Sequence, residues 1–360
     1  MAKFSLVFFD FSIILLIFAS SKDNHKTMVE AQKKNVRNTN IEILRFVLMV
    51  FICFWHVIVH GYCFKFYGEP GFVLNADIKI ITFFTTLFAP ATYCFMFISG
   101  WYGIKYSLRK YLYFAFLAIC CMVLTIGIRF YLGDIDSWYP VVSHIFPIAT
   151  EKWWFLTCYI MVFLIAPFIE AGMKVIDPKM LKQIVYIMTF IEVGSLMLQE
   201  PTGLSFFGLL YIYFLARYLR MIQFDCSTRK LIIAYLVAFI ALWALSYGAS
   251  YLGGFKWIAW ILAGSYNNPA IIIMAITTFF LVNKIKPTHI GWLNRIFENV
   301  LIIYLLTEGV GPVLYKYEAG LISSAPLQGI LFVLATVLCC LVIGKVLALL
   351  YSFVSKAFPN

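Results

Sequence analysis

Charged side chains are scarce in this sequence of 360 residues. They make up 12% of the chain, about half of the ~25% that is usual in soluble domains, whereas hydrophobic residues reach 63%. A soluble globular enzyme of this length has no means of hiding so much apolar surface, so that class is excluded. The net charge of +11 does not indicate a nucleic-acid-binding chain either, because basic residues in so apolar a sequence are typically a topology signal.

The sequence also lacks the cysteine spacing of a disulfide framework or a zinc site. Its nine cysteines are an odd number, and no two of them form a C-x-x-C pair. Inside an apolar run a thiol behaves as a small hydrophobic group, and most of the cysteines lie in such runs: Cys53, Cys94, Cys120, Cys121, Cys158, Cys339 and Cys340. We therefore expect no bound metal.

Long apolar stretches, by contrast, fill the chain after residue 40. A membrane-spanning helix needs about 20 mostly apolar residues, and about ten such stretches follow one another: 41–60, 78–102, 111–132, 153–169, 181–198, 203–221, 231–251, 268–283, 297–315 and 326–351. The apolar piece 255–263 is too short to span and is interpreted as interfacial or re-entrant. The sequence thus predicts an all-α, polytopic membrane helical bundle with one transmembrane domain, 41–351, and a tail, 352–360.

The distribution of Lys and Arg predicts the orientation of this bundle. If the first span begins in the cytoplasm, the inner segments collect most of the basic residues, and the outer loops hold few: Lys65, Lys152, Lys256 and Lys316. Both termini are then cytoplasmic. The N-terminal extension 1–40 is unusual, because residues 1–20 resemble a signal peptide although Asp10 interrupts the apolar run. Our preferred interpretation is that translation starts at Met28, which leaves 29–40 as a basic cytoplasmic segment.

Ionisable residues inside a membrane are costly and usually functional, and several of them lie on the first span. Arg45 and His56 are eleven residues apart, so they project from one helix face, about 16 Å apart along the axis. Glu42 and His60 lie near the same face. Arg45 and His56 each have a simpler explanation, because Arg45 can extend to the headgroups and His56 can be a packing residue. A metal site at His56 and His60 is a further alternative, although no third ligand is apparent.

Four motifs in order resemble the membrane acyltransferase 3 family, the multi-span O-acyltransferases of bacterial surface saccharides. The first is a basic residue, ten residues and a histidine, here Arg45 and His56. The second is an F-x-x-S-G-type segment and a later basic residue, and the third is W-F-x-x-x-Y. In the fourth, I-Y-L-x-H, the family often has His where this chain has Thr307. The residues that match the last three motifs are Ser99, Gly100, Arg109, Trp154, Tyr159, Tyr304 and Glu308.

The resemblance implies an enzyme that transfers an acetyl or other short acyl group from cytoplasmic acyl-CoA to a hydroxyl of a cell-surface saccharide, in the plasma membrane and with no permanently bound cofactor. His56 would be the catalytic base or a transient acyl carrier, and Arg45 and Arg109 would bind the coenzyme phosphates. Glu192 and Glu308 are both candidates for pairing with His56 or with an internal Arg. A transporter or flippase of lipid-linked saccharide, or an inactive relative, stays open. The residues expected to support the substrates are His60, Ser99, Gly100, Trp154, Tyr159, Tyr304 and Glu308.

Overall fold

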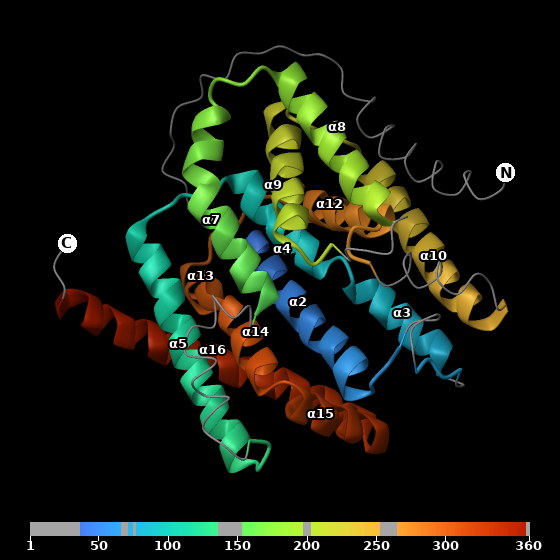
Figure 1. The fold of residues 1–360 in the computed structure, drawn as a ribbon, viewed down its shortest axis with the longest axis vertical. Helices are drawn as coiled ribbons and strands as arrows, with labels where there is room; N and C mark the ends of the chain where they lie inside the picture. Colours follow the sequence, from blue (N-terminus) through green and yellow to red (C-terminus); the bar gives the residue numbers. More distant parts are fainter. Residues whose placement is uncertain are drawn as a thin grey trace.

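The computed structural model describes residues 37–65, 71–74, 77–135, 153–196, 203–252 and 265–357. Within these ranges every regular element is a helix (Figure 1). The expected start at Met28, the segment 29–36, the apolar piece 255–263, Lys152 and Lys256 fall outside the described residues. The elements are α2 (Thr39–His56), η1 (Val57–Gly61), α3 (Ile78–Phe88), α4 (Ala91–Tyr102), α5 (Leu108–Tyr131), α7 (Trp154–Gly172), α8 (Pro178–Ser195), α9 (Phe206–Met221), α10 (Thr228–Leu252), α12 (Pro269–Asn283), α13 (Gly291–Ile296), η3 (Phe297–Asn299), α14 (Leu301–Val310), α15 (Pro312–Ser324) and α16 (Pro326–Ala357).

Local sequence signals explain where several helices begin. Asn38, Ser107 and Ser205 each accept a hydrogen bond from a backbone amide in the first turn of α2, α5 and α9, respectively. These side chains satisfy amides that have no partner within the helix. Asp177 caps α8 in the same way, and Pro178 follows it at the first helical position, where a missing N–H has no cost.

The prediction of an all-α membrane protein is confirmed, but the number of spans is not. In the part of the chain that the structure describes, six helices or helix pairs are long and apolar enough to cross a membrane, and a bent pair brings the number to seven. Large apolar side chains on α16, such as Leu331, Leu338 and Val342, are exposed. A water-soluble surface rarely presents such a continuous apolar face, and here it is suited to contact with lipid.

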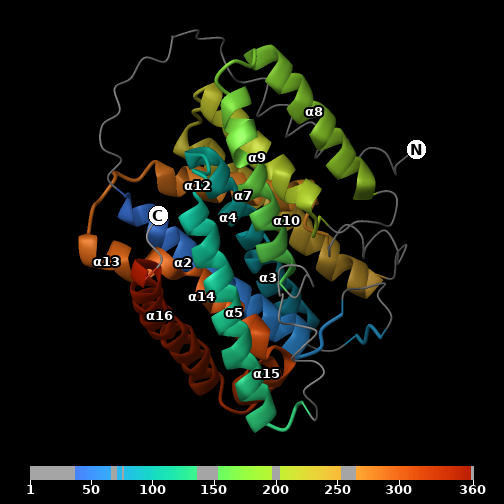
Figure 2. The same ribbon diagram turned by 60° about the vertical axis from the view of Figure 1, so that its left-hand side comes forward.

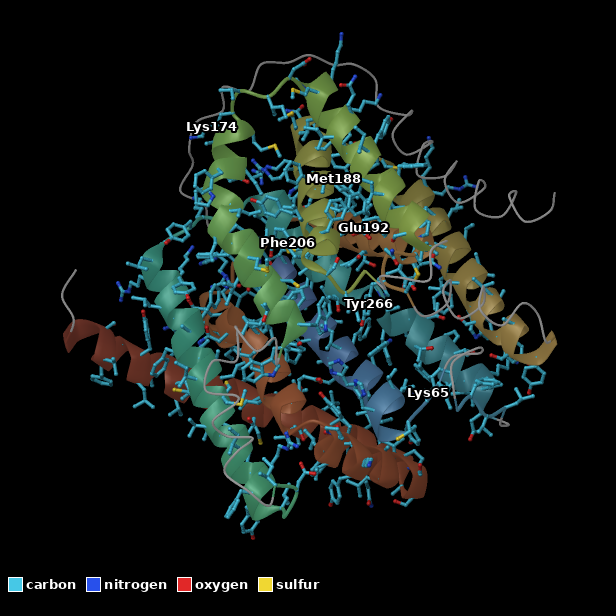
Figure 3. All side chains as sticks on the ribbon, viewed as in Figure 1. Lys65, Lys174, Met188, Glu192, Phe206 and Tyr266 are labelled. Atoms are coloured by element: carbon cyan, nitrogen blue, oxygen red, sulfur yellow. The ribbon has the colours of Figure 1, made fainter. Side chains whose placement is uncertain are left out.

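The most buried helix, α4, lies at the centre of the bundle. It packs against α2, α9 and α12, while α7 and α8 pack on α9, and α10 packs on α12 and α3 (Figure 1). On the other side of α2, α14 contacts both α5 and α16 and is seen between these two helices in the turned view (Figure 2). Lys174, expected inside the cell, and Lys65, expected outside, lie at opposite ends of the molecule (Figure 3).

The expected ninth span, 297–315, is not one straight helix. The helical segment Gly291–Val310 and the helix Pro312–Ser324 meet at an angle of 93°. Gly311 at the junction has φ +67° and ψ −135°, a conformation that essentially only glycine adopts. Pro312 follows and has no N–H with which to continue the helical ladder. This bend was not predicted from the sequence. It lies close to His56, because Tyr315 in the helix after the bend contacts His56.

Candidate active site

His56 lies at the last residue of α2, where it is buried with 7% exposure. Its Nδ1 atom is 3.2 Å from Oε2 of Glu308 and 3.1 Å from the hydroxyl of Tyr315. The Tyr315 hydroxyl in turn donates to the same Oε2 atom of Glu308 at 2.9 Å. Of the two carboxylates that the sequence left open as partners of His56, the structure therefore selects Glu308. Glu192 lies elsewhere, on α8, where its backbone carbonyl accepts a hydrogen bond from Asn267.

The hydrogen bonds of this triad favour one tautomer of the His56 imidazole. Because Tyr315 donates its proton to Glu308, the consistent tautomer of His56 carries its proton on Nδ1 and donates it to the acceptors there. The lone pair on Nε2 is then free to accept a proton from a substrate. An imidazole oriented by a carboxylate is the usual arrangement of a general base in acyl transfer.

Arg45 lies on the same face of α2 as His56. Its side chain is partly buried and forms an ion pair with Glu42. The Nη1 atom of Arg45 is 3.0 Å from Oε1 of Glu42, and Nε of Arg37 is 2.9 Å from the same oxygen. The Glu42 side chain is 3% exposed, so it serves as a buried anchor between two cations. The Nε atom of Arg45 is buried and has no hydrogen-bond partner among the described residues, which leaves a donor available to a ligand.

A cavity of about 460 Å³ extends from Arg45 toward the interior. Four cations, two carboxylates and an aromatic inner wall shape it, and the charged lining residues are Arg37, Arg45, Lys105, Lys110, Glu42 and Glu298. Ser99, Phe155 and Tyr159 line it further in. The ring of Phe155 is 6.1 Å from that of Tyr304, whose ring is 6.3 Å from that of His56. One aromatic side chain therefore separates the wall of the cavity from the His56 triad.

Comparison with known protein families identifies the class of protein. The acyltransferase 3 family model, described as an acyltransferase domain, matches residues 38–345. The chain belongs to the acyltransferase 3 family. Membership makes the protein an acyltransferase, which favours an enzyme over the transporter or flippase that the sequence left open. No curated protein and no solved structure matches the chain significantly.

The structure of this acyltransferase places most of the motif residues around the cavity and the triad. Trp154 packs on Tyr266 with ring centroids 6.1 Å apart, near the middle of the molecule (Figure 3). Gly100 allows α4 to approach α9, because a Cβ there would lie 2.8 Å from Cβ of Ala216. Thr307, at the position where the family often has His, is buried and donates to the carbonyl of Ile303.

Arg109 lies apart from the cavity. Its side chain is exposed, and its backbone carbonyl accepts a hydrogen bond from Tyr351. The cavity is lined instead by Lys110, the next residue, and by Lys105. Sequence reasoning missed both lysines, because a motif with a loosely defined basic position cannot distinguish neighbouring cations.

His60 belongs to η1, a π-helical turn that follows α2. The wider turn changes the register expected for a regular α-helix, yet the His60 ring stays 5.4 Å from that of His56 and stacks 5.9 Å from that of Tyr315. Ligand atoms of His56, His60 and Glu308 all lie within 4.8 Å of one another, a grouping that can hold a metal ion. Glu308 supplies the third ligand that the sequence did not reveal, so the expected absence of a metal stays a prediction.

Tyr315 is the member of the triad that was not predicted from the sequence. It lies in the first turn of α15 and is 1% exposed. Read as part of the straight span 297–315, it has no evident relation to His56. The pair Gly311 and Pro312 was the available signal, since glycine followed by proline commonly interrupts a helix.

Proposed function

We propose that this acyltransferase moves an acetyl or other short acyl group from cytoplasmic acyl-CoA to a hydroxyl of a cell-surface saccharide. The observation that carries the proposal is the geometry of one face of α2. A cavity bearing cations begins at Arg45, and a His56–Glu308–Tyr315 triad lies at the far end of the same helix, about 16 Å along the axis for eleven residues. An acyl donor with phosphates at one end and a thioester at the other fits this distance between the cations of the cavity and the imidazole of His56.

The cations of the cavity are suited to the phosphates of acyl-CoA. Arg45 presents an unpartnered Nε–H, and Arg37, Lys105 and Lys110 surround it. Charged hydrogen bonds from a guanidinium to phosphate are short and strong, and the Glu42 carboxylate keeps Arg45 oriented before the donor arrives. Arg109 is exposed at the start of α5 and does not line the cavity, so this proposal assigns the phosphate contact expected of it to Lys105 and Lys110.

His56 acts as the general base in the proposed reaction. Its Nε2 atom removes the proton of the acceptor hydroxyl as the oxygen attacks the thioester carbonyl, and the imidazolium that forms is stabilised by Glu308, 3.2 Å from Nδ1. The departing thiolate then takes this proton, so that an ester and free coenzyme A leave. Transfer through a transient acyl-His56 is the other route open to an imidazole.

In this proposal the protein crosses a bacterial plasma membrane ten times, and both of its termini lie in the cytoplasm. Beyond the six apolar spans and the bent pair, it counts the shorter or less apolar helices α8, α9 and α12. His56 then lies in the outer half of the bilayer, because α2 runs about 22 Å from Ile41 to residue 56 across a core of ~30 Å. Such a position suits a donor that enters from inside and an acceptor outside.

The test is acetyl-CoA turnover by the purified protein, combined with mass spectrometry of surface saccharides from a deletion strain. His56→Ala is expected to lower transfer about 10²–10⁴-fold, as loss of an essential base does. His56→Asn is the matched variant, because its side-chain amide can still donate toward Glu308 but cannot act as a base. A stable His56→Asn protein that transfers at the wild-type rate would overturn the role of His56 as the base, whereas absence of turnover by the unmodified protein would leave an inactive relative as the explanation.

A further inference from the structure

The N-terminal turn of α7 has backbone amides that no side chain caps. The helix begins at Trp154, and its N-cap residue Trp153 makes no capping hydrogen bond with its side chain. The first amides of a helix have no acceptor within the helix, and they lie at the positive end of its dipole. At α7 these are the amides of Trp154, Phe155 and Leu156. Such a turn alone does not define a binding site, but a second group points into this one.

That group is the hydroxyl of Tyr304 on α14. The Tyr304 side chain is 4% exposed, and its Oη atom has no hydrogen-bond partner among the described residues. The backbone amide of Phe155 lies next to this oxygen. A buried hydroxyl without a partner is unfavourable in a folded protein. The Tyr304 O–H is therefore a donor held ready beside the donors of the α7 turn.

The position of this pair of donors relates it to both substrates. The Phe155 side chain lines the inner wall of the donor cavity, and the Tyr304 ring lies between Phe155 and His56. A thioester delivered along the cavity therefore arrives at the first turn of α7. We infer that the Tyr304 hydroxyl and the first-turn amides of α7 form the oxyanion hole of the acyl transfer, an inference that rests on the proposed function.

The chemistry requires donors at this place. When the acceptor oxygen bonds to the thioester carbon, the carbonyl π electrons move to the carbonyl oxygen, and His56 holds the acceptor proton. The resulting oxyanion accepts hydrogen bonds from the Tyr304 O–H and an α7 amide, while the helix dipole favours its negative charge. The carbonyl then reforms, the carbon–sulfur bond breaks, and the thiolate takes the proton from His56.

Substitution Tyr304→Phe tests this assignment, because it removes the donor and keeps the ring that packs against Phe155 and His56. Removing one oxyanion donor typically lowers kcat about 10²–10³-fold, and we expect that loss with an unchanged KM for acetyl-CoA and unchanged thermal stability. Tyr211→Phe is the matched control. Tyr211 is fully buried on α9 and its hydroxyl bonds to Thr189, so its loss leaves kcat near the wild-type value.

Infrared spectroscopy supplies a readout independent of turnover. With carbonyl-¹³C acetyl-CoA bound to His56→Asn, which holds the donor without transferring it, hydrogen bonds from the oxyanion hole lower the carbonyl stretching frequency. Adding Tyr304→Phe should reverse part of that shift. If His56→Asn abolishes transfer but Tyr304→Phe changes neither kcat nor the frequency, this inference is wrong and the proposed function stands. If neither variant affects transfer, the assignment of His56 as the base is wrong as well, and if the unmodified protein shows no transfer, the proposed function itself fails.

Discussion

Glu308→Gln is the substitution that best tests the proposed triad. Glutamine keeps the shape of the side chain and retains a carbonyl oxygen that can accept the hydrogen bond from Tyr315, which now runs 2.9 Å to Oε2. It removes the negative charge that lies 3.2 Å from Nδ1 of His56. The resting structure should persist, whereas the imidazolium that forms during transfer loses its counter-charge.

The size of the effect follows from that distance. Two unit charges 3.2 Å apart attract by about 5 kcal/mol at an effective dielectric constant of ~20. The Glu308 side chain is 27% exposed, so water screens part of this attraction. We expect a loss of about 3–4 kcal/mol in transition-state stabilisation, which is roughly a 100- to 1000-fold decrease in kcat.

The assay is release of the coenzyme A thiol from acetyl-CoA, measured as kcat and KM beside the midpoint of thermal unfolding. Glu192→Gln is the matched control, because Glu192 is a carboxylate of 3% exposure on α8, outside the triad, and its kcat should stay close to wild type. A folded Glu308→Gln protein with wild-type kcat would show that the carboxylate does not stabilise charge on His56, and the base mechanism would have to be abandoned.

Two further predictions concern the donor and the metal. Arg45→Ala should weaken acetyl-CoA binding about 10- to 150-fold, the equivalent of one charge-assisted hydrogen bond of about 1.5–3 kcal/mol. Arg45→Lys should recover only part of this affinity. Equal affinities of Arg45→Ala and the wild type in equilibrium binding would contradict the donor site. Because Arg37 still pairs with Glu42, the fold should tolerate both changes. Treatment with a chelator should leave transfer unchanged, since His56 and Glu308 interact directly; loss of activity that Zn²⁺ restores would replace the base with a metal-activated mechanism that includes His60.

The helices, and the helix face that Arg45 and His56 share on α2, could be predicted from the sequence because they depend on local pattern. Each of the ten apolar stretches overlaps with at least one of the helices, since apolar length and capping residues act over short distances. Arg45 and His56 lie on one face of α2 for the same reason. The spacing of residues within one helix is enough to place them relative to each other.

The partners of His56 could not be predicted, because they come from other helices. Both Glu192 and Glu308 were possible partners of His56, and periodicity gives no information on which helix packs beside which. The pairing of Arg45 with Glu42, three residues away, was within reach of local reasoning. By contrast, the cavity of Lys105, Lys110 and Tyr159 depends on how α5 and α7 pack, which only the tertiary structure decides.

The break at Gly311 shows why a local signal can matter more than the pattern around it. In a straight helix, Glu308 and Tyr315 would lie seven residues and about 10 Å apart along the axis, beyond the i+3 and i+4 neighbours that contact each other. The 93° bend instead places the Tyr315 hydroxyl 2.9 Å from the Glu308 carboxylate and 3.1 Å from His56. The interruption of the helix therefore assembles the triad, and the two residues that cause it, Gly311 and Pro312, contribute to the active site through the backbone alone.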